Sequence, residues 1–176
     1  MFSLNPSLQS YSWGSKTLIA DLRGEESPTQ HPQAELWYGA HPAAPADIAG
    51  VPLTDIIAAD PDRELGAAVR ARFGDRLPFL LKILAVAEPL SLQAHPSLAQ
   101  AQEGFRRENA QGIDVRAGNR NYRDDNHKPE LIVALTPFHA MAGFRPLAAT
   151  LELFAALDCP SLARYVGMID STGEEA

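Results

Sequence analysis

Residues 79–95, FLLKILAVAEPLSLQAH, contain the feature that most limits the possible folds of this chain. The apolar run FLLKILAVA has the length and aliphatic character of a buried β-strand. If SLQAHP, residues 91–96, continues in extended form, Ser91, Gln93 and His95 share one face, and the apolar residues between them share the other. The sequence therefore predicts a strand over residues 79–94 with a polar face lining a cavity.

Local signals predict two helices on either side of this region. The first spans Pro61 to Phe73, with Asp60 as N-cap and Gly74 at its end. The second runs from Leu98 to Asn109, where Ser97 and Gln100 have the spacing of a capping box. Residues 1–52 are rich in proline, and we expect short strands and turns there.

The last third of the chain begins with a polar stretch, residues 110–129, whose length is typical of a functional loop. We expect ELIVALT, residues 130–136, to form a strand and FHAMAGF, residues 138–144, to be a second extended piece. From Pro146 onward the apolar residues have helical spacing. The composition thus shifts from β-rich to helical near Arg145.

Composition excludes several classes of function. The net charge of −7 and pI near 5.2 argue against general binding to nucleic acid or to acidic membranes. No apolar run is long enough to span a bilayer, and the N-terminal residues lack the pattern of a secretory signal. The single cysteine, Cys159, fits a reducing compartment. We expect a cytoplasmic globular protein.

Gln93 and His95 have a natural third partner in Glu130, the first residue of ELIVALT. An imidazole, a carboxylate and an amide oxygen can converge on one metal ion if the two segments are neighbours. Nitrogen and oxygen ligands without a thiolate fit zinc or another divalent ion. A histidine hydrogen-bonded at a strand end and a solvent-facing glutamate would fit the same residues.

Two of the three lysines fall beside these candidates. Lys128 lies two residues before Glu130, and Lys82 interrupts the apolar run, where its charge needs a partner or a cavity. Cations next to a metal suit an anionic substrate such as a sugar phosphate. A solvated edge position is the alternative for Lys82. Trp13, Trp37 and Glu35 are weaker candidates for sugar contacts, with core tryptophans and a surface glutamate as alternatives.

Several stretches together resemble one family, the type I phosphomannose isomerases. They are YSWGSK, AELWYGAHP, LPFLLKILAVAEPLSLQAHP and RNYRDDNHKPELIVALTPFHAMAGFRP, in the family's order, from about Tyr11 to about Pro146. The resemblance implies zinc-dependent interconversion of mannose 6-phosphate and fructose 6-phosphate. It assigns Gln93, His95 and Glu130 as zinc ligands, Lys128 as the candidate catalytic residue, and Ser91, Lys82, Trp13 and Glu35 as substrate-binding residues.

The resemblance also implies a mostly β fold with helices, a cupin-type jelly roll that is incomplete in this chain. The expected domains are residues 1–145, a catalytic portion with the zinc-ligand strands, and residues 146–176, the start of a helical insertion. The family supplies a further zinc-ligating histidine and an active-site arginine from later segments. A C-terminal segment or a second polypeptide is therefore an expected partner, besides the sugar phosphate. The alternatives are a non-catalytic cupin-like module that binds a sugar phosphate or metal, and a fragment without independent function.

Overall fold

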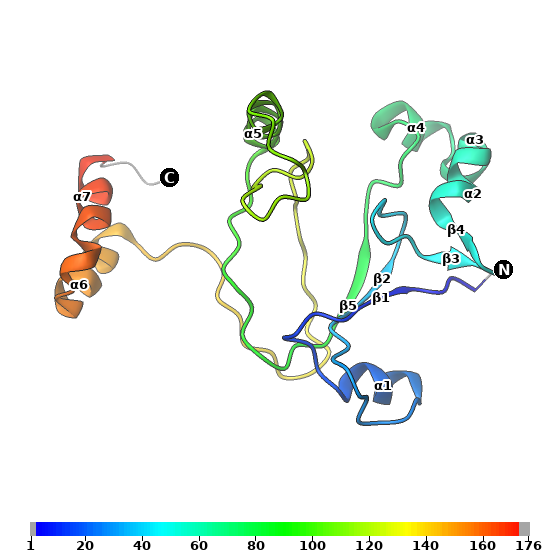
Figure 1. Cartoon of the computed structure of the whole chain (residues 1–176), viewed down its shortest axis with the longest axis horizontal. Coiled ribbons are helices and arrows are strands. Elements are labelled where there is room, and N and C mark those ends of the chain that lie inside the picture. The colour runs from blue at the N-terminus through cyan, green and yellow to red at the C-terminus, as the bar shows by residue number, and fades with distance from the viewer. Residues whose placement is uncertain (1–2, 173–176) are drawn as a thin grey trace. The chain divides into compact units, whose positions relative to one another are not determined.

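The computed structural model describes residues 3–172 and divides the chain into two compact units, one ending at Ala94 and one beginning at His95. Each unit is described by itself (Figure 1). No helix among the described residues is long and apolar enough to cross a membrane.

A three-stranded antiparallel sheet forms the centre of the first unit. Its strands are β1 (Ser7–Gln9), β2 (Glu35–Tyr38) and β5 (Leu81–Leu84), in the order β1-β2-β5. The apolar side chains of Ile19, Leu36 and Ala85 form its small core. Ile19 comes from α1 (Leu18–Arg23), a helix that was not predicted, whereas the predicted short strands and turns are present.

A second, two-stranded sheet pairs β3 (Asp47–Ile48) with β4 (Val51–Pro52) and leads into three short helices, α2 (Leu53–Ala59), α3 (Pro61–Leu65) and α4 (Ala67–Phe73). The predicted helix over residues 61–73 is therefore broken in the middle. Both predicted ends are confirmed, because the Asp60 side chain accepts a hydrogen bond from the Arg63 backbone N–H and Gly74 has a φ of 71°. The break lies at Gly66, whose φ of 77° and ψ of 157° lie outside the helical region.

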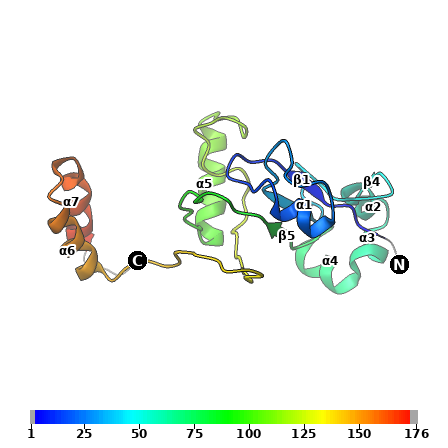
Figure 2. The same cartoon turned by 90° about the horizontal axis from the view of Figure 1, so that it is seen from below.

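The second unit is helical wherever it has regular structure. The helix α5 (Leu98–Ala110) begins with the predicted capping box of Ser97 and Gln100. The predicted helical region after Pro146 contains α6 (Leu147–Leu157), the 3₁₀ turn η1 (Pro160–Leu162) and α7 (Ala163–Thr172). Helices α6 and α7 lie side by side (Figures 1 and 2).

The strand predictions around the candidate metal ligands are wrong for this structure. The strand predicted over residues 79–94 contains only the four residues of β5, and residues 91–96 belong to no strand. The segments ELIVALT and FHAMAGF also lack strand structure, and Leu131, Val133 and Leu135 are 90%, 73% and 80% exposed. A strand exists only by hydrogen bonding to a neighbour, and within residues 3–172 no segment pairs with residues 130–144.

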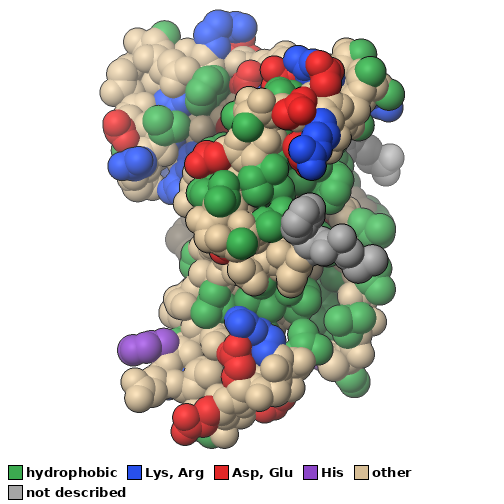
Figure 3. Space-filling model, turned by 90° about the vertical axis from the view of Figure 1, so that its right-hand side faces the viewer, with side chains coloured by type: hydrophobic (Ala, Val, Ile, Leu, Met, Phe, Trp, Pro, Cys, Tyr) green, Lys and Arg blue, Asp and Glu red, His purple; other side chains and the backbone are tan. Residues whose placement is uncertain are grey.

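Apolar side chains are accordingly common at the surface, as the space-filling view in Figure 3 shows. In the first unit Phe79 and Leu81, at the start of the edge strand β5, are 65% and 59% exposed. An uncovered strand edge with exposed apolar side chains is a surface that other chain segments usually cover.

Candidate active site

The structure brings His95 and Glu130 together within the second unit. The Nε2 atom of His95 lies 3.2 Å from Oε2 of Glu130, and the Nζ atom of Lys128 lies 3.5 Å from Oε1 of the same carboxylate. One carboxylate thus lies between an imidazole and an ammonium group. All three side chains are partly exposed, so they remain accessible to a ligand.

The donor atoms of this group fit a divalent metal ion. The imidazole nitrogen and carboxylate oxygen are borderline-to-hard ligands of the kind that zinc accepts, and they already face each other. The third candidate, Gln93, lies two residues before His95 and offers an amide oxygen. Within residues 3–172 no three His, Cys, Asp or Glu side chains are gathered closely enough to hold a metal by themselves.

Ser91 and Gln93 lie in the extended segment after β5, and both are exposed. Neither side chain makes a hydrogen bond to another of the described residues, so the structure does not bring Ser91 or Gln93 into a group of contacting side chains. Their assignment to the site stays a prediction.

A second group of predicted residues meets on the sheet of the first unit. Glu35 and Trp37 are alternate residues of β2, and Lys82 of β5 pairs directly with Trp37. The Trp37 Nε1–H donates a hydrogen bond of 2.5 Å to Oε2 of Glu35, and the Lys82 Nζ atom is 3.6 Å from the same oxygen. Lys82 also lies over the Trp37 ring, 4.6 Å from its centroid. The charge of Lys82 was expected to need a partner or a cavity, and its partners in the structure are the Glu35 carboxylate and the Trp37 ring.

Aromatic residues of the N-terminal segment lie near this group. The rings of Tyr11 and Trp13 are stacked, with centroids 5.6 Å apart and planes 24° from parallel. Burial raises the pKa of the Tyr11 phenol, and the nearby charge of Glu35 raises it further. The Trp13 backbone carbonyl accepts hydrogen bonds from the N–H groups of Ala87 and Glu88, just after β5. Trp13 is thereby tied to the strand that carries Lys82.

A buried ion pair in the second unit holds the start of the segment that carries Lys128 and Glu130. The fully buried Arg120 side chain lies 3.0 Å from Oε2 of Glu108 on α5 and donates to the Ile113 and Tyr122 carbonyls. Glu108 accepts hydrogen bonds from the Tyr122 and Asn121 backbone N–H groups, which hold its pKa below the usual range. This pair was not predicted, since nothing in the sequence of a polar loop marks which arginine is buried.

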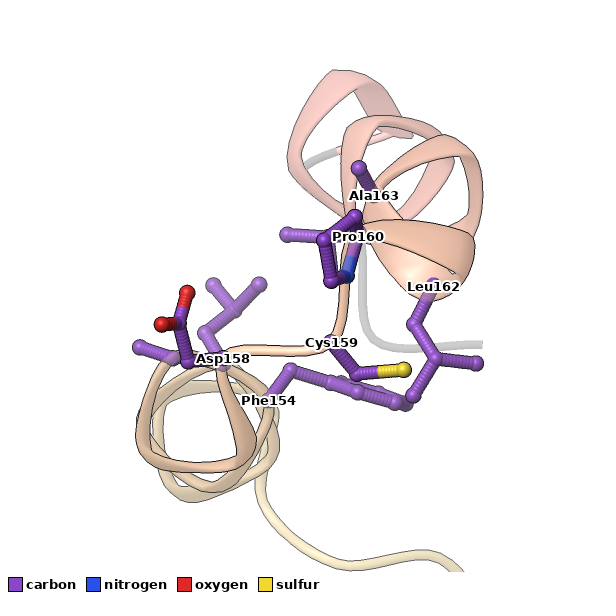
Figure 4. Close-up of a pocket in the computed structure, with 9 residues that line it drawn as sticks. Phe154, Asp158, Cys159, Pro160, Leu162 and Ala163 are labelled. Atoms are coloured by element: carbon purple, nitrogen blue, oxygen red, sulfur yellow. The ribbon is translucent and has the colours of Figure 1, made fainter.

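A hollow of about 320 Å³ in the second unit lies between α6 and α7. Figure 4 shows Cys159 and Pro160 in the link between the helices, and the lining is mostly apolar. The Cys159 Sγ atom is 3.1 Å from the Ser161 hydroxyl oxygen, and hydrogen bonding to Ser161 lowers the pKa of the thiol. The lining includes none of the predicted zinc ligands and no lysine.

Comparisons with known proteins define the class of protein to which this chain belongs. Residues 1–147 match the family model of the phosphomannose isomerase type I catalytic domain. The mannose-6-phosphate isomerase of Escherichia coli (strain K12) is 46% identical over 178 residues, covering 97% of this chain and 45% of that protein. The human protein of the same name is 38% identical over 160 residues, covering 84% of this chain and 35% of the human protein.

Comparison with solved structures indicates the same family. The crystal structure of mannose 6-phosphate isomerase from Salmonella typhimurium bound to fructose 6-phosphate and zinc has a TM-score of 0.78, with 48% identity over 88% of this chain and 40% of that one. The chain belongs to the type I phosphomannose isomerase family, as its motifs predicted. It spans less than half the length of these relatives.

Proposed function

We propose that this chain is the N-terminal part of a zinc-dependent aldose–ketose isomerase that interconverts mannose 6-phosphate and fructose 6-phosphate. The observation that carries the proposal is the Glu130 carboxylate between the His95 imidazole and the Lys128 ammonium. Family membership supports it, since relatives are named for this reaction and one structure contains fructose 6-phosphate and zinc.

In this proposal Gln93, His95 and Glu130 hold the zinc ion. Zinc, when bound, supplies a Lewis acid that stabilises negative charge on the sugar oxygens. The isomerisation moves a proton between C1 and C2 of the open-chain sugar through an enediol. Lys128 is the candidate for holding or moving a proton, because its ammonium lies 3.5 Å from a ligand carboxylate.

The substrate-binding residues of the proposal are Ser91, Lys82, Trp13 and Glu35. The Lys82 ammonium offers charge to an anionic sugar, and Ser91 offers a hydroxyl. Trp13 presents an aromatic surface stacked on Tyr11, which suits the apolar face of a sugar ring. The buried Glu35 carboxylate holds Lys82 and can accept hydrogen bonds from sugar hydroxyls.

The proposed fold is a cupin-type jelly roll, with residues 1–145 as its catalytic portion and residues 146–176 as the start of a helical part. Support comes from the antiparallel sheet, from β5 at its edge, and from the exposed apolar segment 131–135. Added strands from a C-terminal segment or a second polypeptide would cover these surfaces. The single cysteine supports the proposed cytoplasmic location.

A coupled assay for fructose 6-phosphate tests the proposal. The chain is assayed alone and fused to the remaining part of the Escherichia coli relative, with and without zinc. We expect little turnover from the chain alone and zinc-dependent turnover from the fusion. His95→Ala should abolish that turnover, whereas His31→Ala, which changes an exposed histidine of the first unit, should not.

One outcome would contradict the proposed reaction, and another would contradict only the need for a further segment. A folded fusion that binds mannose 6-phosphate without turnover would favour the non-catalytic module. Zinc-dependent turnover by the chain alone would show that no further segment is required.

A further inference from the structure

The aromatic ring of Trp37 makes contacts that go beyond packing in the core. Trp37 is 9% exposed and Glu35 is 7% exposed, so water cannot satisfy their polar atoms fully. A buried indole N–H needs an acceptor, and the Glu35 carboxylate provides it at 2.5 Å. The alternation of β2 places both side chains on one face.

The same two side chains confine the ammonium of Lys82. Its Nζ atom lies 3.6 Å from the Glu35 oxygen that accepts the indole hydrogen bond, and 4.6 Å from the centre of the ring. The cross-strand pairing of Trp37 with Lys82 brings the lysine to the ring. A free lysine side chain samples many rotamers, whereas a carboxylate and an aromatic face together select one position for its charge.

The ring of Trp37 is itself fixed. The His41 ring packs against it edge-on, with centroids 4.8 Å apart and planes at 64°. The indole therefore contacts a second ring, a hydrogen-bond acceptor and a cation. Rotation of the ring would break the hydrogen bond and the cation–π contact together.

We propose that Trp37 is a positioning residue that fixes the Lys82 ammonium, through its ring and through its hydrogen bond to Glu35, for contact with an anionic sugar substrate. The inference rests on the proposed function for the identity of that substrate. The placement of Lys82 by Trp37 does not depend on the proposed function. Trp37 itself has no role in the chemistry.

Nuclear magnetic resonance on the 176-residue chain tests the placement directly. The chain has three lysines, so the side-chain Hε signals can be separated and that of Lys82 assigned with Lys82→Arg. Protons above an aromatic face are shifted upfield by the ring current. We expect an upfield Hε signal for Lys82 relative to Lys16 and Lys128.

Two variants separate the ring from the N–H donor. Trp37→Phe keeps an aromatic face and removes the donor, so the Lys82 signal should move part of the way toward those of the other lysines. Trp37→Leu removes both, so the signal should move the whole way. Tyr38→Phe changes the next residue of β2 and should leave the signal unchanged. Backbone spectra identify any variant that fails to fold, and Trp37→Phe remains the test if Trp37→Leu does.

Affinity for mannose 6-phosphate, measured with zinc present on the fusion with the remaining part of the Escherichia coli relative, tests the link to function. Loss of the indole hydrogen bond, together with a weaker cation–π contact to phenylalanine, should weaken binding by about five- to tenfold in Trp37→Phe. The Tyr38→Phe fusion should bind like the wild-type fusion. A Lys82 signal that is not shifted upfield, or that stays shifted in both Trp37 variants, would overturn the inference.

The two claims fail separately. If the wild-type fusion binds no sugar phosphate but the Lys82 signal of the chain depends on Trp37, the proposed function fails and the positioning role stands. If the wild-type fusion binds the sugar and the Trp37→Phe fusion binds it equally well, the positioning role for substrate fails alone.

Discussion

The His95 imidazole and the Glu130 carboxylate, 35 residues apart in the sequence, lie with Nε2 and Oε2 3.2 Å from each other. Both belong to the second unit, and neither lies in a helix or strand. Loop residues that carry chemistry are usually held by a more rigid neighbour. The ion pair between Glu108 of α5 and Arg120 of the following loop supplies such an anchor within the same unit.

Close packing of α5 against Tyr122 makes Gly104 intolerant of a larger side chain. A Cβ atom at Gly104 would lie 2.4 Å from the Tyr122 ring, whereas one at Gly167 in α7 would meet nothing within 4 Å. Gly104→Ala should lower the free energy of unfolding by about 1–3 kcal/mol. Gly167→Ala should raise it by up to about 1 kcal/mol, because alanine favours the helix. Chemical denaturation of both variants measures the contrast, and equal effects would contradict the packing.

Acid should weaken the anchor formed by Glu108. Because the folded-state pKa of Glu108 is lowered, its contribution to stability is present above the ordinary carboxyl pKa and is lost as pH falls through the folded value. Thermal unfolding between pH 7 and pH 3 should show this loss, and Glu108→Gln should flatten the dependence. Glu103→Gln, on the exposed face of the same helix, should retain it. An unchanged acid profile in Glu108→Gln would contradict the prediction.

Lys128 should affect turnover more than zinc binding. In the fusion described above, Lys128→Gln should lower kcat by about 10²–10⁴-fold if Lys128 holds or moves the proton. Zinc content should stay unchanged, and Lys16→Gln serves as the control. An increase in KM with kcat unchanged would show that Lys128 binds substrate and leaves the proton transfer to another group.

The thiol of Cys159 should be more reactive than an ordinary cysteine. Its pKa is lowered by the Ser161 hydroxyl and by backbone N–H groups of the turn. Ser161→Ala should raise the pKa and slow alkylation by iodoacetamide near neutral pH. As the chain has one cysteine, mass spectrometry follows the reaction without ambiguity. Equal rates for the two chains would show that the hydroxyl has no such effect.

Local rules correctly predicted those structural features, such as helix caps, that depend only on neighbouring residues in the sequence. The caps at Asp60 and Ser97 follow from side chains that reach three residues along the chain. The break at Gly66 was missed because a single glycine is compatible with a continuous helix. The strand predicted for ELIVALT failed for a different reason. Its apolar pattern is correct for a strand, but pairing requires a partner that residues 3–172 do not provide.

In the candidate site, too, residue identities were predictable from the sequence, whereas contacts between distant segments were not. Motifs identified His95, Glu130, Lys82 and Glu35, and the structure brings them together in pairs. The sequence also marked Trp37, but its place beside Glu35 and Lys82 was not predicted, although alternate residues of one strand must face the same side. The burial of Arg120 depends on how a loop folds onto α5, and no spacing in the sequence indicates it.

Zinc titration of the purified chain tests the proposed metal site most directly. We expect one zinc ion per chain, bound more weakly than by a four-ligand site. His95→Ala and Glu130→Gln should remove this binding, and His31→Ala should leave it intact. Binding by the His95→Ala chain equal to that of the wild-type chain would contradict the proposed zinc centre.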